Sequence, residues 1–197
     1  MRERAALRRV RDEARQCRRC DLWRHATQTV FGEGATGGAL LVGEQPGDVE
    51  DRQGRPFVGP AGSLLRDVLA EVGLAESDVY LTNAVKHFKW RPRGTRRIHD
   101  TPSWSEIRAC DHWLRRELAL VRPALVVALG ATAAQALLGR GARVGVLRGR
   151  VLEAEELGAP VIVTLHPSAV LRGGERREEL RRDLVADLDL ARRTLAR

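Results

Sequence analysis

The sequence has little of several features that mark particular classes of protein. Three cysteines in 197 residues cannot close a disulfide framework, so a reduced compartment is expected. The longest apolar stretch, residues 124–139, contains glycines and is too short to span a bilayer. The opening residues, MRERAALRRVRDEARQ, have a charged helical pattern without the apolar centre of a secretory signal. We therefore expect a cytoplasmic protein with no membrane partner.

Lysine is also scarce, since Lys86 and Lys89 are the only two in the chain. Nearly all of the positive charge is therefore arginine, and Lys+Arg 34 against Asp+Glu 26 gives a net charge of +8. Such a charge attracts polyanions, which favours a nucleic-acid partner, although an arginine-rich coding bias would give the same composition. With 43% hydrophobic and 30% charged residues, residues 1–197 are expected to form one soluble domain.

Four short aliphatic or β-branched runs have the pattern of central parallel strands: residues 40–43, 79–85, 125–130 and 161–165. Helical patterns alternate with these runs over residues 61–74, 102–118, 131–139 and 174–197. In the second helix, Ser103 is the expected N-cap and Glu106 completes a capping box. This order predicts an α/β fold, a three-layer α/β/α sandwich with a central, mainly parallel four-stranded sheet. Polar residues just past the carboxyl ends of its strands should line the binding crevice.

The segment KHFKWRPRGTRRIHDTPSW, residues 86–104, lacks the apolar periodicity of a strand or helix over most of its length. It is too charged to be a buried connection. We expect a surface loop, or a loop that lies against a charged ligand.

The cysteines raise the question of a metal site. Cys17 and Cys20 form a C-x2-C pair, Cys110 is distant in sequence, and His87, at a predicted strand end, is a plausible fourth ligand. Zinc and an iron–sulfur cluster suit these ligand types almost equally well. The alternative is that Cys110 is a small buried hydrophobe and that the C-x2-C pair has no function.

The motifs GEQPGDVEDRQGRPFVGPAG, TNAVKHF, RRIH and HPSAVLR, in this order around C-x2-C and Cys110, resemble the iron–sulfur family 4 uracil-DNA glycosylases. The resemblance covers roughly residues 17–172 and is closer to the UdgX branch of that superfamily. Three differences from ordinary family 4 members support this: Gln45 in place of alanine, the arginine-rich insertion ending in RRIH, and His87 in place of a cysteine. The resemblance implies a uracil-DNA glycosylase-like fold and a structural [4Fe-4S] cluster held by Cys17, Cys20, His87 and Cys110.

The same resemblance assigns roles around the base. The amide of Asn83 would donate to uracil O4 and accept from N3–H, a pattern that cytosine reverses, and Phe57 would stack on the ring. His166 would donate a hydrogen bond to the oxyanion that develops on the departing uracil. Without the surrounding motifs, Asn83 would be read as a turn residue and Phe57 as a core residue. A core role for His166 is less favoured, because the Pro167 and Ser168 that follow it indicate a loop.

Other residues of the motifs would act on the sugar and the flanking DNA. Glu44 would place a carboxylate near the cationic sugar, and Gln45 would contact the base or the sugar. Asp48 would position a water or its own loop, while Asp51 could be only a solvated charge. DNA contacts are expected from the following residues: Arg96, Arg97, Ser168 and Arg172.

The resemblance to the UdgX branch implies that His99 is the nucleophile, because the matching histidine of that branch is understood to attack the sugar. An imidazole close to C1′ would compete with water at high effective molarity and form a C–N bond that has no easy leaving step. Attack requires the neutral ring, which a carboxylate such as Glu44 would orient. In the alternative, RPRGTRR is a phosphate-contacting loop in which His99 has no chemical role.

Three functions remain open on the sequence. The first is a monomeric protein that excises uracil from DNA, preferably single-stranded, and becomes covalently joined to the abasic sugar through His99. The second is a turnover family 4-type glycosylase that releases free abasic DNA. The third is a metal-stabilised nucleic-acid-binding module without catalysis, which leaves GEQPGD and HPS unexplained.

Overall fold

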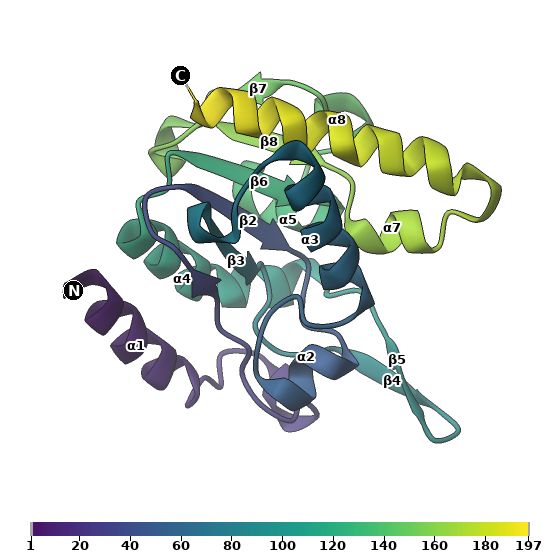
Figure 1. Cartoon of the computed structure of the whole chain (residues 1–197). Coiled ribbons are helices and arrows are strands. Elements are labelled where there is room, and N and C mark those ends of the chain that lie inside the picture. The colour runs from purple at the N-terminus through teal and green to yellow at the C-terminus, as the bar shows by residue number, and fades with distance from the viewer. Residues whose placement is uncertain (1, 197) are drawn as a thin grey trace.

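A six-stranded sheet runs through the centre of the molecule in the order β1-β3-β2-β6-β8-β7 (Figure 1). The four inner strands pair in parallel and correspond to the four predicted strands: β3 (Val79–Asn83), β2 (Ala39–Gly43), β6 (Leu125–Leu129) and β8 (Val161–Thr164). Two antiparallel edge strands, β1 (Glu33–Gly34) and β7 (Val151–Leu152), extend the expected four-stranded sheet to six. Each is only two residues long and shows no alternation that the sequence could reveal.

The computed structural model describes residues 2–196. The expected domain over residues 1–197 and the expected last helix over 174–197 therefore include positions, Met1 and Arg197, that lie outside the described residues. Within the described residues, no helix has both the length and the apolar character that crossing a membrane requires.

Helices cover both faces of the sheet, which confirms the layered architecture (Figure 1). Their bounds are α1 (Arg2–Ala14), α2 (Asp48–Gln53), α3 (Pro60–Val72), α4 (Trp104–Val121), α5 (Ala131–Leu138), α6 (Val144–Leu147), α7 (Pro167–Leu171) and α8 (Arg177–Leu195). The predicted capping box begins α4, because the Glu106 N–H donates to Ser103 Oγ at 3.3 Å and the Ser103 N–H donates to Glu106 Oε2 at 2.6 Å.

Alternate residues of the strands divide the core into two halves. Leu40 and Val42 of β2 pack with α1, α4 and α5 on one face, whereas Ala39 and Leu41 pack with α3, α7 and α8 on the other. All five residues of β2, β3 and β6 are buried. Both faces of these strands are therefore covered, which explains why their sequences are continuous apolar runs.

The arginine-rich segment is not an irregular loop. It forms an antiparallel hairpin of β4 (Trp90–Arg93) and β5 (Arg96–His99), in which Trp90 lies opposite His99. Gly94 turns the chain with a φ of 58°, a conformation that glycine adopts without a steric penalty. The hairpin projects from the sheet at the lower right of Figure 1, and its polar residues on both faces leave no apolar alternation to detect.

The residues after β8 also differ from expectation. HPSAVLR, expected as a loop, contains the short helix α7, with Pro167 at its first position and His166 as its N-cap. Proline suits this position because its missing N–H would have no partner there. The expected helix over 174–197 begins as α8 at Arg177, after one turn of 3-10 helix.

Candidate active site

A cavity of about 880 Å³ opens at the carboxyl ends of the central strands. It brings together nine of the predicted site residues: Glu44, Gln45, Asp48, Phe57, Asn83, His99, His166, Ser168 and Arg172. These residues come from segments after β2 and β8, the end of β3, and the hairpin. Arg96 and Arg97 do not line it.

His166 is fixed in one tautomer by its neighbour. The backbone N–H of Ser168 donates to His166 Nδ1 at 3.1 Å, so in the neutral ring the proton is on Nε2. Burial lowers the pKa of His166 to about 4, with a further lowering from Arg172 and an opposing effect of Glu44. At neutral pH the ring is therefore an uncharged hydrogen-bond donor at the cavity wall.

Asn83 and Phe57 lie together at the end of β2. Asn83 is 3% exposed, and among the described residues its side-chain amide makes no hydrogen bond to the protein. The lack of a side chain at Gly43 keeps the two in place, because a Cβ there would lie 2.4 Å from Asn83 Oδ1 and 2.6 Å from Phe57 Cζ. The amide therefore has both its donor and its acceptor free for a ligand.

The backbone of Phe57 is in the left-handed region, with a φ of 54°. Such a conformation costs a residue with a side chain on the order of 1–3 kcal/mol and is concentrated at functional sites. The ring lies 6.2 Å from that of His166, centroid to centroid, with 26° between the planes. A flat ligand that entered the cavity would therefore meet aromatic surface.

Glu44 connects the hairpin to the sheet. Its Oε1 lies 3.0 Å from His99 Nε2, and its Oε2 accepts a hydrogen bond of 2.6 Å from the Thr132 hydroxyl. Burial acts to raise the pKa of Glu44, but the hydrogen bonds from His99 and Thr132 outweigh it and hold the pKa below its usual value. The structure thus places an ionised carboxylate against the half-exposed ring of His99. Thr132, in the first turn of α5, was missed in the sequence because an isolated threonine carries no signal.

Gln45 lines the cavity, where its contact with base or sugar stays a prediction, and its side chain is also bonded to the hairpin. Its Nε2 donates to the backbone carbonyls of Lys89 and Asp100 at 3.1 and 3.0 Å, and its Oε1 accepts from the Lys89 N–H at 2.9 Å. These two residues flank the hairpin on either side. The amide is therefore occupied in holding the base of the hairpin beside the cavity.

Arg97 also holds the hairpin, where the sequence suggested a phosphate contact. Its Nη1 lies 2.7 Å from Asp51 Oδ2, and its Nε pairs with Asp48 Oδ1 at 2.5 Å. Asp51, which was expected to be a solvated charge, is fully buried and also accepts the Thr27 N–H at 2.9 Å. Burial acts to raise the pKa of Asp48, but the hydrogen bonds and charges of Arg52 and Arg97 outweigh this effect and hold the pKa below its usual value. The role suggested for Asp48 in positioning its loop agrees with these contacts.

The four expected cluster ligands come from three segments: Cys17 and Cys20 follow α1, His87 precedes β4, and Cys110 lies on α4. Cys17 and Cys110 are buried in the core half that contains α1 and α4, and Cys20 packs against it. The Lys86 N–H donates to Cys110 Sγ at 3.2 Å, and Trp113 Nε1 donates to Cys17 Sγ at 3.0 Å. Among residues 2–196, no three His, Cys, Asp or Glu side chains are grouped in a way that could hold a metal ion.

His87 nevertheless presents a free nitrogen to its buried surroundings. The Thr29 hydroxyl donates to the Ala14 carbonyl at 3.0 Å, so its oxygen accepts from His87 Nε2 at 2.9 Å. The neutral ring then has its lone pair on Nδ1, and this atom is buried without a hydrogen-bond partner in the described part of the chain. A ligating histidine has the same pattern, in which the nitrogen that does not bind metal donates to a neighbour.

A buried ion pair below the cavity was not anticipated. The ammonium group of Lys86 pairs with Glu117 and donates to the Asn83 carbonyl at 2.7 Å, and both charged side chains are fully buried. Glu117 further accepts hydrogen bonds from the Gly32 N–H and the Tyr80 hydroxyl. A sequence signal existed, since Glu117 lies on the apolar face of α4 three residues after Leu114.

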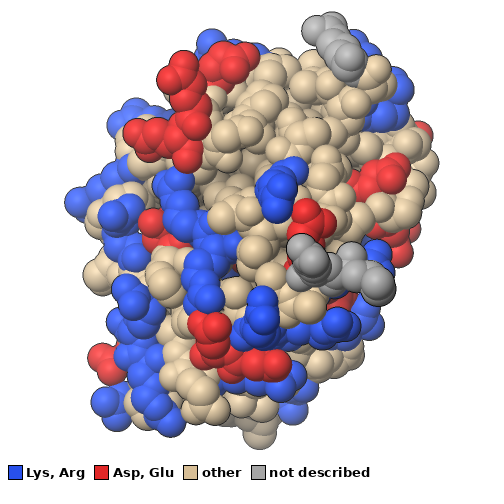
Figure 2. Space-filling model, turned by 90° about the vertical axis from the view of Figure 1, so that its left-hand side faces the viewer, with Lys and Arg blue, Asp and Glu red and all other residues tan. Residues whose placement is uncertain are grey.

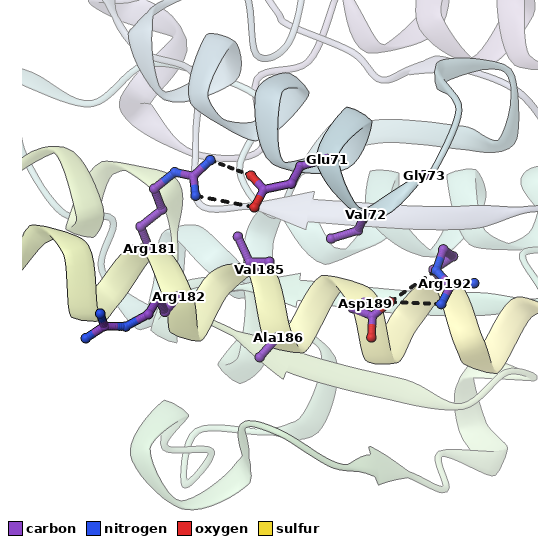
Figure 3. Close-up of a pocket in the computed structure, with 9 residues that line it drawn as sticks. All are labelled: Glu71, Val72, Gly73, Arg181, Arg182, Val185, Ala186, Asp189 and Arg192. Atoms are coloured by element: carbon purple, nitrogen blue, oxygen red, sulfur yellow. Dashed lines mark hydrogen bonds and ion pairs between the residues drawn. The ribbon is translucent and has the colours of Figure 1, made fainter.

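A second hollow, between α3 and α8, is a weaker candidate for a site (Figure 3). Four of its charged side chains form pairs, Arg181 with Glu71 and Arg192 with Asp189, while Arg182 points away from them. Basic residues are also spread over the side that carries α1, where they form bands separated by acidic clusters (Figure 2). Neither feature brings unpaired polar groups together in a cavity, as the carboxyl edge of the sheet does.

Comparison with known proteins identifies the family of the chain. The family model described as the uracil DNA glycosylase superfamily matches residues 31–189. A type-4 uracil-DNA glycosylase of Thermotoga maritima is 40% identical over 185 residues, covering 93% of this chain and 91% of the relative. One of Pyrobaculum aerophilum is 37% identical over 186 residues, covering 91% of each chain. The chain therefore belongs to the uracil DNA glycosylase superfamily.

Proposed function

We propose that this protein excises uracil from DNA and then becomes covalently attached to the abasic sugar through His99. The superfamily membership and the type-4 relatives support uracil excision. The attachment is supported by one observation in particular, the placement of His99 in the same cavity as Asn83 and His166, 3.0 Å from the Glu44 carboxylate. We further propose that the chain acts as a monomer in the cytoplasm.

Recognition would begin when the uridine enters the cavity, either extruded from a duplex or taken from a single strand. The free amide of Asn83 would donate to O4 and accept from N3–H, and Phe57 would cover the face of the ring. Cytosine would leave buried polar groups unpaired, at about 1–3 kcal/mol for each group. The preference for single strands stays a prediction.

Cleavage of the N-glycosidic bond moves the bonding electron pair onto uracil and leaves a cationic sugar. His166 Nε2–H would donate a hydrogen bond to the developing uracil oxyanion. Because the ring is neutral at pH 7, it would act as a hydrogen-bond donor and not as a cation. Glu44, held ionised by Thr132 and His99, would stabilise the sugar cation. The negative charge on uracil would thus be stabilised by His166, and the positive charge on the sugar by Glu44.

The covalent step uses the lone pair of the neutral His99 ring. The nitrogen without the proton would form a bond to C1′, which makes the ring a cation, and Glu44 would accept the remaining N–H. Uracil is already gone, so no bond has to break in this step. The hairpin would hold the imidazole near C1′ at an effective concentration that water cannot match. Gln45 and Arg97 would contribute by fixing the hairpin.

A [4Fe-4S] cluster is proposed for Cys17, Cys20, His87 and Cys110. The three thiols and the unpartnered His87 Nδ1 provide four ligand atoms of suitable chemistry. Such a cluster would supply structural cross-linking of the amino-terminal segment, the hairpin stem and α4. Iron and sulfide analysis of the purified protein tests it, since a zinc protein would be colourless and free of sulfide.

The turnover glycosylase is the competing function, because the two relatives compared above are named type-4 uracil-DNA glycosylases. A denaturing gel with a uracil-containing single-stranded oligonucleotide separates the two. A heat-stable shifted band supports covalent attachment, and free abasic product in excess over protein supports turnover. His99→Ser should abolish the band and allow water to complete the reaction. If the protein neither shifts the oligonucleotide nor releases uracil, the non-catalytic binding module is the remaining function.

A further inference from the structure

The segment that leads from α5 into α6 contains glycines that the fold does not require. At Gly141 and Gly145 the φ angles are ordinary, and an added Cβ would meet no atom within 4 Å. By contrast, a Cβ at Gly62 would lie 1.8 Å from the Phe57 carbonyl oxygen. Gly145 also lies within the helix α6, where glycine is less favourable than alanine. Close approach of another molecule would explain a bare backbone at this position.

An apolar side chain projects from the same helix. Val146 is 60% exposed, more than any other large hydrophobic residue in the described part of the chain. Its neighbour Val144 lines the cavity together with His99 and Arg172. Val144 thus places the one-turn helix α6 at the edge of the candidate site, and Val146, two positions further along it, is left mostly uncovered by protein.

Positive charge at this rim is also left free. Arg143 immediately precedes α6, is exposed, and has no ion-pair partner among residues 2–196. Arg148, at the other end of α6, is instead paired with Asp183 at 3.0 Å and Asp187 at 3.1 Å. Arg148 is thus used in ion pairs within the protein, whereas Arg143 is available to bind an anion.

We propose that residues 143–146 form a DNA-binding rim that contacts the strand flanking the extruded uridine, an inference that rests on the proposed uracil excision. Arg143 binds a backbone phosphate, Gly145 lets the strand approach the helix closely, and Val146 packs against the neighbouring base. The hairpin and α7 border the same cavity, so the rim gives the DNA a further contact beside those expected from Arg96 and Arg172. The charge and the apolar surface together fit a nucleic-acid strand, whose phosphates and base faces alternate.

The test is fluorescence anisotropy of a labelled oligothymidylate without uracil, titrated with protein at several salt concentrations. Arg143→Ala should reduce the slope of log K against log salt by about 0.7, the value for one phosphate of a single strand. Arg8→Ala is the matched control, because Arg8 is also exposed and without an ion-pair partner in the described residues but lies on α1. Val146→Ser should weaken binding several-fold with the slope unchanged, whereas Val151→Ser, at a 38% exposed valine on β7, should not.

The rim is refuted if Arg143→Ala retains the wild-type slope, or if Val146→Ser binds as tightly as Val151→Ser. This outcome is distinct from failure of the proposed function. That failure would be the absence of uracil release by the wild-type protein, which is measured separately on a uracil-containing strand.

Discussion

The buried pair of Lys86 and Glu117 allows a quantitative prediction. Lys86→Met would remove a fully buried ammonium group that pairs with Glu117 and donates to Thr82 Oγ1 and the Asn83 carbonyl, both at 2.7 Å. Glu117 would stay buried and charged, with only the donors of Gly32, Tyr80 and Thr82 around it. Removing one partner of such a pair costs about 3–5 kcal/mol.

For a domain of this length, each kcal/mol lowers the unfolding midpoint by about 2–4 °C, so we expect a decrease of roughly 6–20 °C. The loss is a large part of the total stability of about 5–15 kcal/mol that domains usually have. Thermal unfolding followed by circular dichroism measures it. Iron content is determined for each variant, because the Lys86 backbone N–H contacts a proposed cluster ligand, Cys110.

Two further variants make the prediction specific. Lys86→Met combined with Glu117→Gln leaves no buried charge, keeps an acceptor oxygen for Gly32, and should be more stable than Lys86→Met alone. Lys89→Met removes a lysine that pairs with Glu106 near the surface at 3.1 Å, and should cost less than about 1 kcal/mol. The reasoning is refuted if Lys86→Met unfolds within a few degrees of Lys89→Met, or if adding Glu117→Gln lowers the midpoint further.

Three other predictions concern the cavity. Gly43→Ala should push Asn83 and Phe57 apart and reduce uracil release by about tenfold or more in single-turnover assays; a wild-type rate would contradict the packing at Gly43. Arg97→Met should loosen the hairpin and lower the yield of His99 adduct more than the rate of uracil release, and equal losses would argue against a positioning role. For His166, whose pKa burial lowers from 6.5 to about 4, the unfolded state binds more protons between these values, so stability is lost as pH falls through them. The stability advantage of the wild type over His166→Gln should therefore shrink by up to about 3 kcal/mol between pH 7 and pH 4. A constant advantage in urea unfolding would show that burial does not lower the pKa of His166.

The parts of the fold that could be predicted are those with continuous apolar surface. The runs ending at Gly43, Leu129 and Thr164 are buried on both faces, so their composition alone indicated parallel strands. From there the location of the site followed, because polar residues after parallel strands converge at one edge of the sheet. The hairpin was not predictable in this way. Its strands, WRPR and RRIH, have polar residues on both faces, so no alternation of apolar and polar residues marks them as strands.

Residue roles were harder to predict than residue locations. Gln45, Asp51 and Arg97 are in the expected region, but their partners lie 24 to 55 positions away in the sequence and become known only when the chain is folded. Motif resemblance identifies which side chains assemble and does not reveal which atoms are already engaged by the protein. For this reason the contacts of Gln45 and Arg97 with the hairpin were not foreseen, and their contacts with DNA stay predictions.

Intact-protein mass spectrometry after exposure to a uracil-containing single strand is the most direct test of the covalent step. The proposed mechanism predicts a mass increase equal to the oligonucleotide minus uracil, located on the peptide that contains His99. Release of uracil together with an unmodified protein mass would contradict it and leave the turnover glycosylase as the function.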